Sequence, residues 1–341
     1  MRDTVLAYRW RAPDVAALED APSPRAGPDQ VVVSIRANGV CRSDLHFYHG
    51  VLEHAPCTMG HEGAGVVASV GSNVTRVREG DRVVVNYVNP DGTCPMCRRG
   101  RTDLCERPPL GFGTDGVFAE AVAIDARNLV GLPEAVPFDE AAILGCAGAT
   151  AYHATLASGL APGMSCMIVG LGGVGMQGVE MAKRFGASPL VAVDVRETKL
   201  AVARRLGADV TVDASKDDPV AFVRSLGDGR GVDVAFEYIG LPDTLNQVIA
   251  SVRWGGRAMM VGIPKGPITF DAQAFNLGGK TLMATQGHTT EDLREVVALR
   301  ARGSLRTAET ITHRFPFKDI AHAIEMLETQ TGDPVRIVLI H

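Results

Sequence analysis

Three glycines near the middle of the chain constrain its fold most strongly. Gly170, Gly172 and Gly175 form the pattern G-x-G-x-x-G directly after the apolar run MIV and at the start of a predicted helix. Such glycines allow a tight turn, a close backbone approach to a pyrophosphate and close helix–strand packing, and the helix N-terminus offers unpaired N–H groups to phosphate oxygens. The pattern predicts a dinucleotide site on a strand–turn–helix unit; the alternative is an ordinary glycine-rich turn.

An acidic residue at the end of the next predicted strand supports the dinucleotide interpretation. Asp194 ends the run LVAVD, 19 residues after Gly175. A carboxylate there accepts hydrogen bonds from the ribose 2′-OH and repels a 2′-phosphate. Arg196 and Lys199 lie nearby and could meet such a phosphate. We expect NAD rather than NADP, and a nicotinamide cofactor implies hydride transfer.

The pattern of residues that predicts strands and helices changes along the chain. Up to residue 146, short β-branched runs are separated by Gly, Asn, Asp and Pro, which is typical of a β-rich or barrel-like domain. Over 147–285 strands alternate with helices, which predicts βαβ units and a parallel sheet. Residues 286–341 contain two predicted helices and closing strands. We therefore expect an α/β protein in which 286–341 rejoins the domain of 1–146.

Composition argues against several classes of partner and location. The 341 residues carry 34 Lys and Arg against 39 Asp and Glu, with a net charge of −5 and no basic run, so we expect neither nucleic acid nor membrane as a partner. No stretch approaches about 18 uninterrupted apolar residues. Charged residues interrupt the first fifteen positions, where a signal peptide needs an apolar run. The chain has seven cysteines, an odd number, in a chain too long to need disulfide bonds for its stability. We therefore expect it in the cytoplasm.

Three of these cysteines crowd into twelve residues and predict a metal site. Cys94 and Cys97 have the C-x2-C spacing that places two thiolates on one ion, and Cys105 lies within reach of the same loop. Asp91, three residues before Cys94, can supply a fourth ligand through oxygen. Such a closed set predicts a structural zinc ion; the alternative is a trio of reduced thiols.

A second group of candidate ligands is scattered. Cys41 lies in GVCRSD, His61 and Glu62 lie in GHEG, and Cys146 lies in GCAG. No spacing rule ties these residues together. Taken one by one, the residues favour structural roles, such as a buried thiol or a hydrogen-bonded histidine.

Taken together, the segments GVCRSDLH, GHEGAGVV, the cysteine cluster, CAGATAYHA, GLGGVG and GGRAMMVGIP resemble the zinc-dependent medium-chain alcohol dehydrogenases. The segments follow one another in the family's order over essentially the whole chain. The resemblance implies a GroES-like catalytic domain split around a Rossmann domain. It also implies reversible oxidation of an alcohol, more often a secondary one, with NAD and zinc, in a homotetramer or homodimer that acts on a small-molecule alcohol or carbonyl substrate.

The resemblance also implies roles for individual residues. Cys41, His61 and Cys146 match the catalytic zinc ligands and Glu62 their acidic neighbour, while Asp44 matches the carboxylate that orients the ligand histidine. Ser43 matches the hydroxyl that hydrogen-bonds the substrate oxygen, and His46 the histidine that passes the proton to solvent. Expected cofactor contacts are Arg42, Thr150, Gly170, Gly172, Gly173, Val174, Gly175, Asp194, Lys199, Val261, Ile263 and Arg336. Val51 and Tyr87 match walls of the substrate pocket, and His49 and His54 are expected to be loop histidines.

One departure concerns the predicted structural zinc. The family usually has four cysteines in this loop, and here Asp91 stands in the place of the first. Because a carboxylate oxygen is a harder ligand than a thiolate, we expect weaker zinc retention.

Three other classes of function remain open at this point. A zinc-independent quinone or enoyl reductase would share the fold without needing Cys41, His61 and Cys146. A non-catalytic protein would bind NAD without turnover. A zinc-ribbon nucleic-acid binder is the least favoured, because the arginines of the cysteine loop have no interleaved aromatic residues on which bases could stack.

Overall fold

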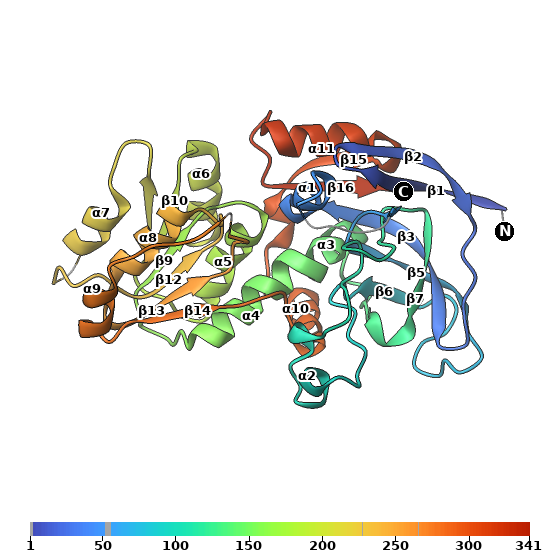
Figure 1. The fold of residues 1–341 in the computed structure, drawn as a ribbon, viewed down its shortest axis with the longest axis horizontal. Coiled ribbons are helices and arrows are strands. Elements are labelled where there is room, and N and C mark those ends of the chain that lie inside the picture. The colour runs from blue at the N-terminus through green and yellow to red at the C-terminus, as the bar shows by residue number, and fades with distance from the viewer. Residues whose placement is uncertain (1–2, 52–55, 227, 265) are drawn as a thin grey trace. The chain divides into compact units, whose positions relative to one another are not determined.

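The computed structural model describes residues 3–51, 56–226, 228–264 and 266–341. These residues form two compact units, one containing the chain up to Ala149 together with Gly287–His341 and the other containing Thr150–Gln286. In Figure 1 the first unit therefore combines the blue and red ends of the chain. The predicted divisions lay at 146/147 and 285/286, a few residues from these boundaries.

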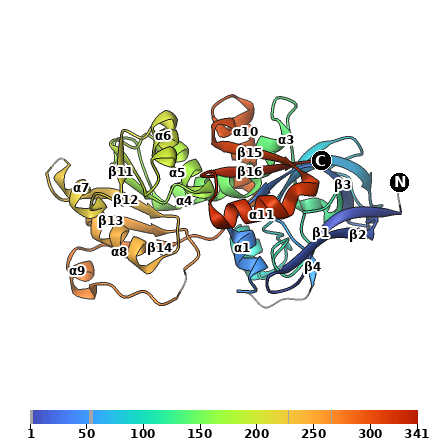
Figure 2. The ribbon, with the colours of Figure 1, turned by 90° about the horizontal axis from the view of Figure 1, so that it is seen from above.

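The second unit is built on a parallel sheet with the strand order β11-β10-β9-β12-β13-β14. Its central strands are buried along nearly their whole length, as expected for parallel strands covered on both faces. Figure 2 shows α6 on one side of this sheet and α8 on the other. The elements are α4 (Ala149–Ser158), β9 (Cys166–Val169), α5 (Gly173–Arg184), β10 (Leu190–Asp194), α6 (Glu197–Leu206), β11 (Val210–Asp213), α7 (Pro219–Ser225), β12 (Val232–Glu237), α8 (Pro242–Ser251), β13 (Val252–Met260), α9 (Ala272–Leu277) and β14 (Thr281–Ala284).

The order of these strands locates the ligand-binding edge of the sheet. The chain starts at the central strand β9, adds β10 and β11 on one side, and then returns to add β12 on the other. In open parallel sheets ligands bind at the carboxyl ends of the strands where the order reverses. Gly170 follows β9 directly at this edge, and Asp194 ends β10 beside it. The parallel βαβ arrangement predicted from the sequence is confirmed.

The first unit is dominated by β-structure. One sheet has the strand order β15-β16-β3-β5-β6-β8, with β7 also paired to β3, and a smaller sheet has the order β2-β1-β4. Strand β16 from the end of the chain runs antiparallel to β3. The strands are β1 (Thr4–Ala12), β2 (Val15–Pro22), β3 (Gln30–Val40), β4 (Cys57–Thr58), β5 (Glu62–Val70), β6 (Arg82–Val85), β7 (Ala121–Asp125), β8 (Leu129–Gly131), β15 (Ile311–Pro316) and β16 (Arg336–Ile340).

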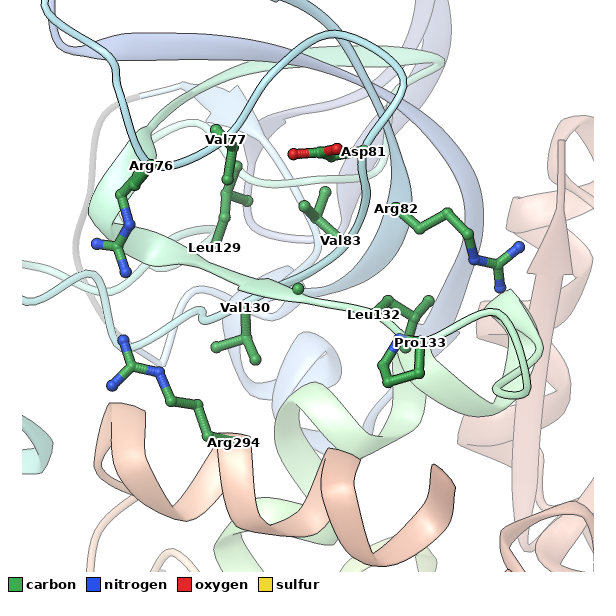
Figure 3. Close-up of a pocket in the computed structure, with 11 residues that line it drawn as sticks. Arg76, Val77, Asp81, Arg82, Val83, Leu129, Val130, Leu132, Pro133 and Arg294 are labelled. Atoms are coloured by element: carbon green, nitrogen blue, oxygen red, sulfur yellow. The ribbon is translucent and has the colours of Figure 1, made fainter. Parts of the chain in front are cut away.

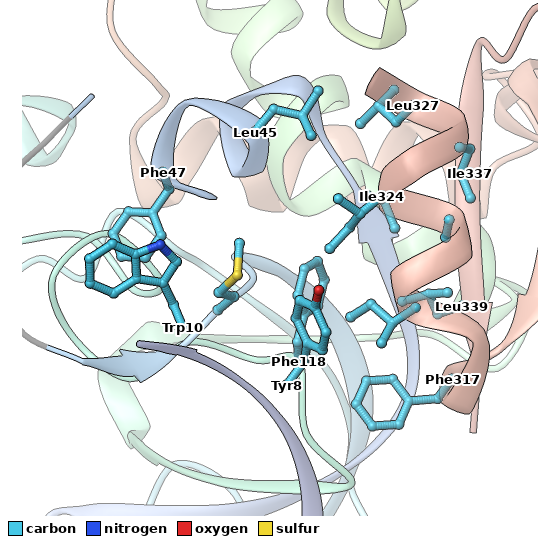
Figure 4. Close-up of a cluster of buried hydrophobic side chains, with 14 of the residues drawn as sticks. Tyr8, Trp10, Leu45, Phe47, Phe118, Phe317, Ile324, Leu327, Ile337 and Leu339 are labelled. Carbon is cyan, nitrogen blue, oxygen red and sulfur yellow. The ribbon is translucent and has the colours of Figure 1, made fainter. Parts of the chain in front are cut away.

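The helices of the first unit are between four and twelve residues long. They are α1 (Arg42–Tyr48), α2 (Pro95–Arg98), α3 (Phe138–Ile143), α10 (Thr290–Ala301) and α11 (Ile320–Thr329), with 3-10 turns at Thr102–Leu104, Ala126–Asn128, Thr307–Thr310 and Phe317–Asp319 and a π-helix at Leu144–Gly148. One apolar cluster joins both ends of the chain, because Tyr8 and Trp10 of β1 pack with α1, α11 and β16 (Figure 4). Among the described residues, no helix combines the length and apolarity needed to cross a bilayer.

Candidate metal and dinucleotide sites

The first candidate ligand lies where β3 ends and α1 begins. Cys41 is the N-cap residue of α1 and is buried. The side chain of Asp44, in the first turn, accepts a hydrogen bond from the Cys41 backbone N–H at 2.9 Å. Because Asp44 is itself buried, this bond fixes the backbone that carries the Cys41 thiol. The Cys41 thiol lies 3.8 Å from the Ser43 hydroxyl.

The same carboxylate orients the second candidate ligand. Asp44 Oδ1 lies 2.8 Å from His61 Nδ1, so His61 donates its Nδ1 proton to Asp44. His61 Nε2 is buried and has no hydrogen-bond partner among the described residues. A buried ring nitrogen with a free lone pair is the atom that a metal ion would occupy.

Glu62 follows His61 and forms a buried ion pair with Arg336 of β16. Gly39 on the paired strand makes room for this pair, because a Cβ at that position would collide with the Glu62 carboxylate and the Arg336 guanidinium. The other carboxylate oxygen, Glu62 Oε1, is buried without a hydrogen-bond partner within the described residues.

Cys146 completes this cluster from a different part of the chain. It lies in the π-helix between α3 and α4, a local widening of the helix that occurs frequently at functional sites. Candidate ligand atoms of Cys41, His61, Glu62 and Cys146 all lie within 4.8 Å of one another, and all four residues are buried. Two thiolates, one imidazole and a carboxylate suit zinc. The structure thus brings together residues that no sequence spacing connects.

Burial and mutual contacts shift the pKa values of this cluster in different directions. A hydrogen bond from Cys146, with help from His61 and Arg336, lowers the pKa of Cys41 well below its usual range despite burial. Burial alone would lower the pKa of His61, but the Asp44 carboxylate and Cys41 outweigh it and raise that pKa. Burial raises the pKa of Glu62 to about 8 against the pull of Arg336. The lowered pKa of Cys41 favours its thiolate, the form that binds metal. The hydrogen bond to Cys41 and burial raise the pKa of Cys146, so Cys146 and His61 must release protons when an ion binds.

Two aromatic rings lie beside His61, and sequence reasoning missed one of them. The ring of Phe112 lies 4.8 Å from the His61 ring, and the ring of Tyr87 lies 5.1 Å from it. Tyr87 was expected as a pocket wall, whereas Phe112 lies in a Gly-rich loop that gave no local signal. That loop packs tightly, since a Cβ at Gly111 or Gly116 would collide with the Gly60 carbonyl. The two rings leave His61 little freedom to rotate.

The predicted zinc loop also forms a cluster. Asp91, Cys94, Cys97 and Cys105 have candidate ligand atoms within 4.8 Å of one another. Backbone N–H groups point at three of them: Asp91 Oδ1 accepts from Cys94 N at 2.9 Å, Cys94 Sγ from Cys97 N at 3.4 Å, and Cys105 Sγ from Asp91 N at 3.4 Å. The backbone bonds from Cys94 and Thr93 lower the pKa of Asp91 to about 2. The backbone hydrogen bonds favour the charged forms of Asp91 and Cys94, whereas burial raises the pKa of Cys97 to about 12.

The glycine-rich turn has the conformation that a dinucleotide requires. Gly170 has a φ of +91°, which favours glycine, and a Cβ at Gly175 would collide with the Gly170 carbonyl. A Cβ at Gly172, the N-cap of α5, would meet nothing within 4 Å, so its backbone is open to a ligand. Asp194 Oδ2 accepts a hydrogen bond from Leu171 N at 2.8 Å, which places the carboxylate beside the turn. These features fit a pyrophosphate and ribose.

The other residues expected to take part in catalysis or cofactor binding are distributed over both units. In the first unit Ser43 and His46 are partly buried on α1, Arg42 and Val51 are exposed, and Arg336 is buried against Glu62. His49 contacts Asp14 and Glu328 at the surface, and His54 lies outside the described residues. In the second unit the expected contacts are buried at Thr150 and Lys199, partly buried at Gly173, Val174 and Val261, and exposed at Ile263.

A separate surface pocket of about 390 Å³ lies beside β8 in the first unit (Figure 3). Val77, Val83 and Val130 are among the side chains that line it, and Arg76 and Arg294 point toward each other at one side. None of the site residues expected from the sequence lines this pocket.

Comparisons with known proteins find relatives that match the chain over most of its length. Residues 27–134 match the alcohol dehydrogenase GroES-like domain, and residues 173–302 match the zinc-binding dehydrogenase family. An L-threonine 3-dehydrogenase of Symbiobacterium thermophilum is 35% identical over 353 residues, covering 100% of this chain and 99% of that protein. An alcohol dehydrogenase of Geobacillus stearothermophilus is 34% identical over 295 residues, with coverage of 85% and 87%. The solved alcohol dehydrogenase of Aeropyrum pernix is 33% identical, with a TM-score of 0.90 and coverage of 98% and 100%.

Proposed function

Since the chain belongs to the zinc-dependent medium-chain alcohol dehydrogenase family, we propose that it oxidises a secondary alcohol to a ketone, reversibly, at a site formed by Cys41, His61 and Cys146. It is a zinc- and NAD-dependent oxidoreductase of alcohols, as its relatives indicate. The observation that carries the proposed site is the buried cluster itself, in which His61 Nε2 has no partner among the described residues.

The residues around the cluster have separate tasks in this proposal. Zinc held there would supply a Lewis acid for the substrate oxygen, and NAD would accept the hydride. Asp44 keeps His61 in the tautomer whose Nε2 can ligate, and Arg336 balances the charge of Glu62. Ser43, whose hydroxyl lies 3.8 Å from the Cys41 sulfur, takes the substrate proton while it releases its own hydroxyl proton. His46 on the next turn of α1 takes up that released proton and passes it to solvent.

In the second unit, the turn from Gly170 to Gly175 and the N-terminus of α5 would hold the pyrophosphate. Asp194 would accept the ribose hydroxyls and disfavour a 2′-phosphate. Thr150, Lys199, Val261 and Ile263 are proposed as further cofactor contacts. Of the two arginines expected near the cofactor, Arg42 is exposed and remains a proposed contact, whereas Arg336 is buried and paired with Glu62. The loop of Asp91, Cys94, Cys97 and Cys105 is proposed to hold a second, structural zinc ion.

Relatives named for different substrates define the substrate classes to test. They include L-threonine 3-dehydrogenases, alcohol dehydrogenases and a sorbitol dehydrogenase. L-Threonine is itself a secondary alcohol, so it belongs in the same assay as simple secondary alcohols and polyols. We also propose a cytoplasmic homotetramer or homodimer, which mass measurement in solution tests.

The decisive experiment combines zinc analysis with a substrate panel. Protein dialysed against a chelator and then resupplied with zinc is assayed for NAD reduction with primary alcohols, secondary alcohols and L-threonine. We expect activity to disappear with the zinc and to return with it. The Cys146→Ala variant should lose one of its two zinc ions together with its activity, whereas Cys166→Ala, at a buried thiol of β9 outside the cluster, serves as the matched control. Turnover that persists without zinc would instead support a zinc-independent reductase.

A further inference from the structure

A buried amide on β3 links three chain segments next to the proposed metal centre. Asn38 is fully buried. Its Nδ2 group donates to the carbonyl of Glu62 at 3.1 Å and to the carbonyl of Val117 at 2.9 Å. Both amide protons are therefore used on backbone carbonyls, and one of these carbonyls belongs to the residue after His61. Asn38 thus ties β3 to the strand start that carries His61 and Glu62.

The remaining oxygen of this amide is held by His341. His341 Nε2 lies 2.7 Å from Asn38 Oδ1. An amide oxygen only accepts, so the histidine must donate from Nε2. The imidazole stacks on Phe317 with 4.2 Å between ring centroids, and the backbone N–H of His341 donates to the Arg36 carbonyl. The ring is thereby fixed in position by a stack, a side-chain bond and a backbone bond.

The protonation state of the ring suits this donor role. Burial, with a contribution from Arg36, lowers the pKa of His341 to about 4. At neutral pH the ring is therefore uncharged, and it carries its single proton on Nε2. Its Nδ1 atom is buried and has no hydrogen-bond partner among the described residues, which suits an unprotonated nitrogen. The Asn38 side chain consequently has its oxygen and both its protons engaged.

The register of the sheet explains why this linkage bears on the metal site. Gly39, the next residue, pairs with Glu62, and Leu339 of β16 pairs with Asn38. If the amide rotates, the Glu62 carbonyl loses the Asn38 donor, whereas the Val117 carbonyl still accepts from the Ala119 N–H at 2.8 Å. A buried carbonyl that loses its donor is unfavourable. The backbone at His61 and Glu62 would relax to recover that bond, and the His61 ring would move with it.

We propose that His341 and Asn38 are positioning residues for the metal centre, acting through the backbone of Glu62 to hold His61 and Glu62 in ligating geometry. This inference rests on the proposed function, because it assumes that the cluster of Cys41, His61 and Cys146 binds zinc. Neither residue touches the ligand atoms themselves. Their effect is therefore on the retention of zinc and on turnover rather than on cofactor binding.

The test compares zinc release to a chelator, monitored with a colorimetric zinc indicator, in full-length variants. His341→Phe keeps a ring to stack on Phe317 but removes the Nε2 donor, and we expect zinc to leave the Cys146-dependent site about tenfold faster, with kcat reduced and KM for NAD unchanged. His341→Gln, whose amide can donate to Asn38, is expected to remain within about twofold of the parent. His313→Phe on β15 is the matched control, because His313 also stacks on a phenylalanine but does not contact Asn38.

The outcomes separate the inference from the function on which it rests. Equal zinc release from the parent and His341→Phe would overturn the inference while leaving the proposed function in place. A parent protein without any Cys146-dependent zinc would overturn both. If His341→Phe does not fold, Asn38→Asp is measured instead; it keeps the oxygen that accepts from His341 and removes the donor to the Glu62 carbonyl, so it should release zinc at least as fast. Release at the parent rate from Asn38→Asp would also reject the inference.

Discussion

Asp44 and His61 form a buried carboxylate–imidazole pair, with 2.8 Å between Oδ1 and Nδ1, while the second oxygen of Asp44 accepts from the backbone of Cys41. One side chain therefore positions two proposed ligands from segments twenty residues apart in sequence. The pair fixes which ring nitrogen of His61 carries the proton, and so which nitrogen is available to a metal ion.

Asp44→Asn should weaken zinc binding with little change in shape. An asparagine that keeps accepting from the Cys41 N–H presents its NH2 group to His61 Nδ1 and so forces the proton onto Nε2. We expect zinc affinity and kcat/KM to fall about 10–100-fold, measured by chelator competition and NAD reduction. Asp14→Asn is the control, because Asp14 makes the same kind of contact with His49 at the surface. Equal losses in the two variants would contradict the tautomer argument.

Gly39→Ala should disturb the Glu62–Arg336 pair. The added methyl group would collide with both charged side chains and with Ile143, and overpacking of this kind costs about 1–3 kcal/mol. We expect a lower free energy of unfolding in denaturant titration, together with reduced activity. Gly131→Ala on β8, where a Cβ would meet nothing within 4 Å, is the control and should leave both quantities unchanged.

Asp194→Asn should reduce the preference for NAD over NADP. The Leu171 N–H donates to Oδ2 of Asp194 and the Val195 N–H to Oδ1, so the single amide oxygen keeps only one of these two bonds. The substitution also removes the negative charge that repels a 2′-phosphate. A hydrogen bond to a charged group contributes about 1.5–3 kcal/mol, so the ratio of kcat/KM for the two cofactors should shift about 10–100-fold. Asp213→Asn, at the end of the neighbouring strand β11, is the control. An unchanged ratio would remove Asp194 from the ribose site.

Acid should destabilise the fold partly through His341. Its pKa is about 4 in the folded chain against 6.5 for an ordinary histidine, so the unfolded chain takes up the proton first. The contribution of His341 to the free energy of unfolding is fully present above pH 6.5 and is lost as the pH falls toward 4. The loss amounts to no more than about 3 kcal/mol. In His341→Phe the fall in Tm between pH 7 and pH 4.5 should therefore be smaller than in the parent. Parallel curves would show that the ring is not buried in this way.

The zinc loop should hold its ion more weakly than a four-cysteine loop. Asp91→Cys is expected to slow zinc release from this loop by about tenfold or more, because zinc favours thiolate over carboxylate oxygen. The parent should contain about two zinc ions per chain, one for each cluster. A ratio near one that stays unchanged in Cys94→Ala would show that the loop holds no zinc.

The local parts of the fold were predictable and the non-local parts of the site were not. The turn from Gly170 to Gly175 carries its own signal, because strand, turn and helix are consecutive, and the parallel sheet around it is confirmed. The α/β class and the family are likewise confirmed. Cys41, His61 and Cys146 are joined only through tertiary structure, so their grouping came from resemblance to a family.

Other features had no sequence signal at all. Phe112 reaches His61 only because a glycine-rich loop packs against Gly60. Asn38 and His341 are separated by almost the whole chain and meet because β16 pairs with β3. No periodicity or spacing encodes such pairs, which depend on how the strands of the first unit assemble.

The pairing of β3 with β16 also bears on the order in which the protein is made. During synthesis β3 leaves the ribosome early, but its neighbour β16 follows only after the whole of Thr150–Gln286. The second unit is continuous in sequence and can fold as soon as it emerges, whereas the first unit must wait with Ala37–Val40 of β3 unpaired on one side, because β7 pairs only Gln30–Ser34 there. This part of β3 is therefore an open strand edge in nascent chains, and the counter-charge for Glu62 arrives late.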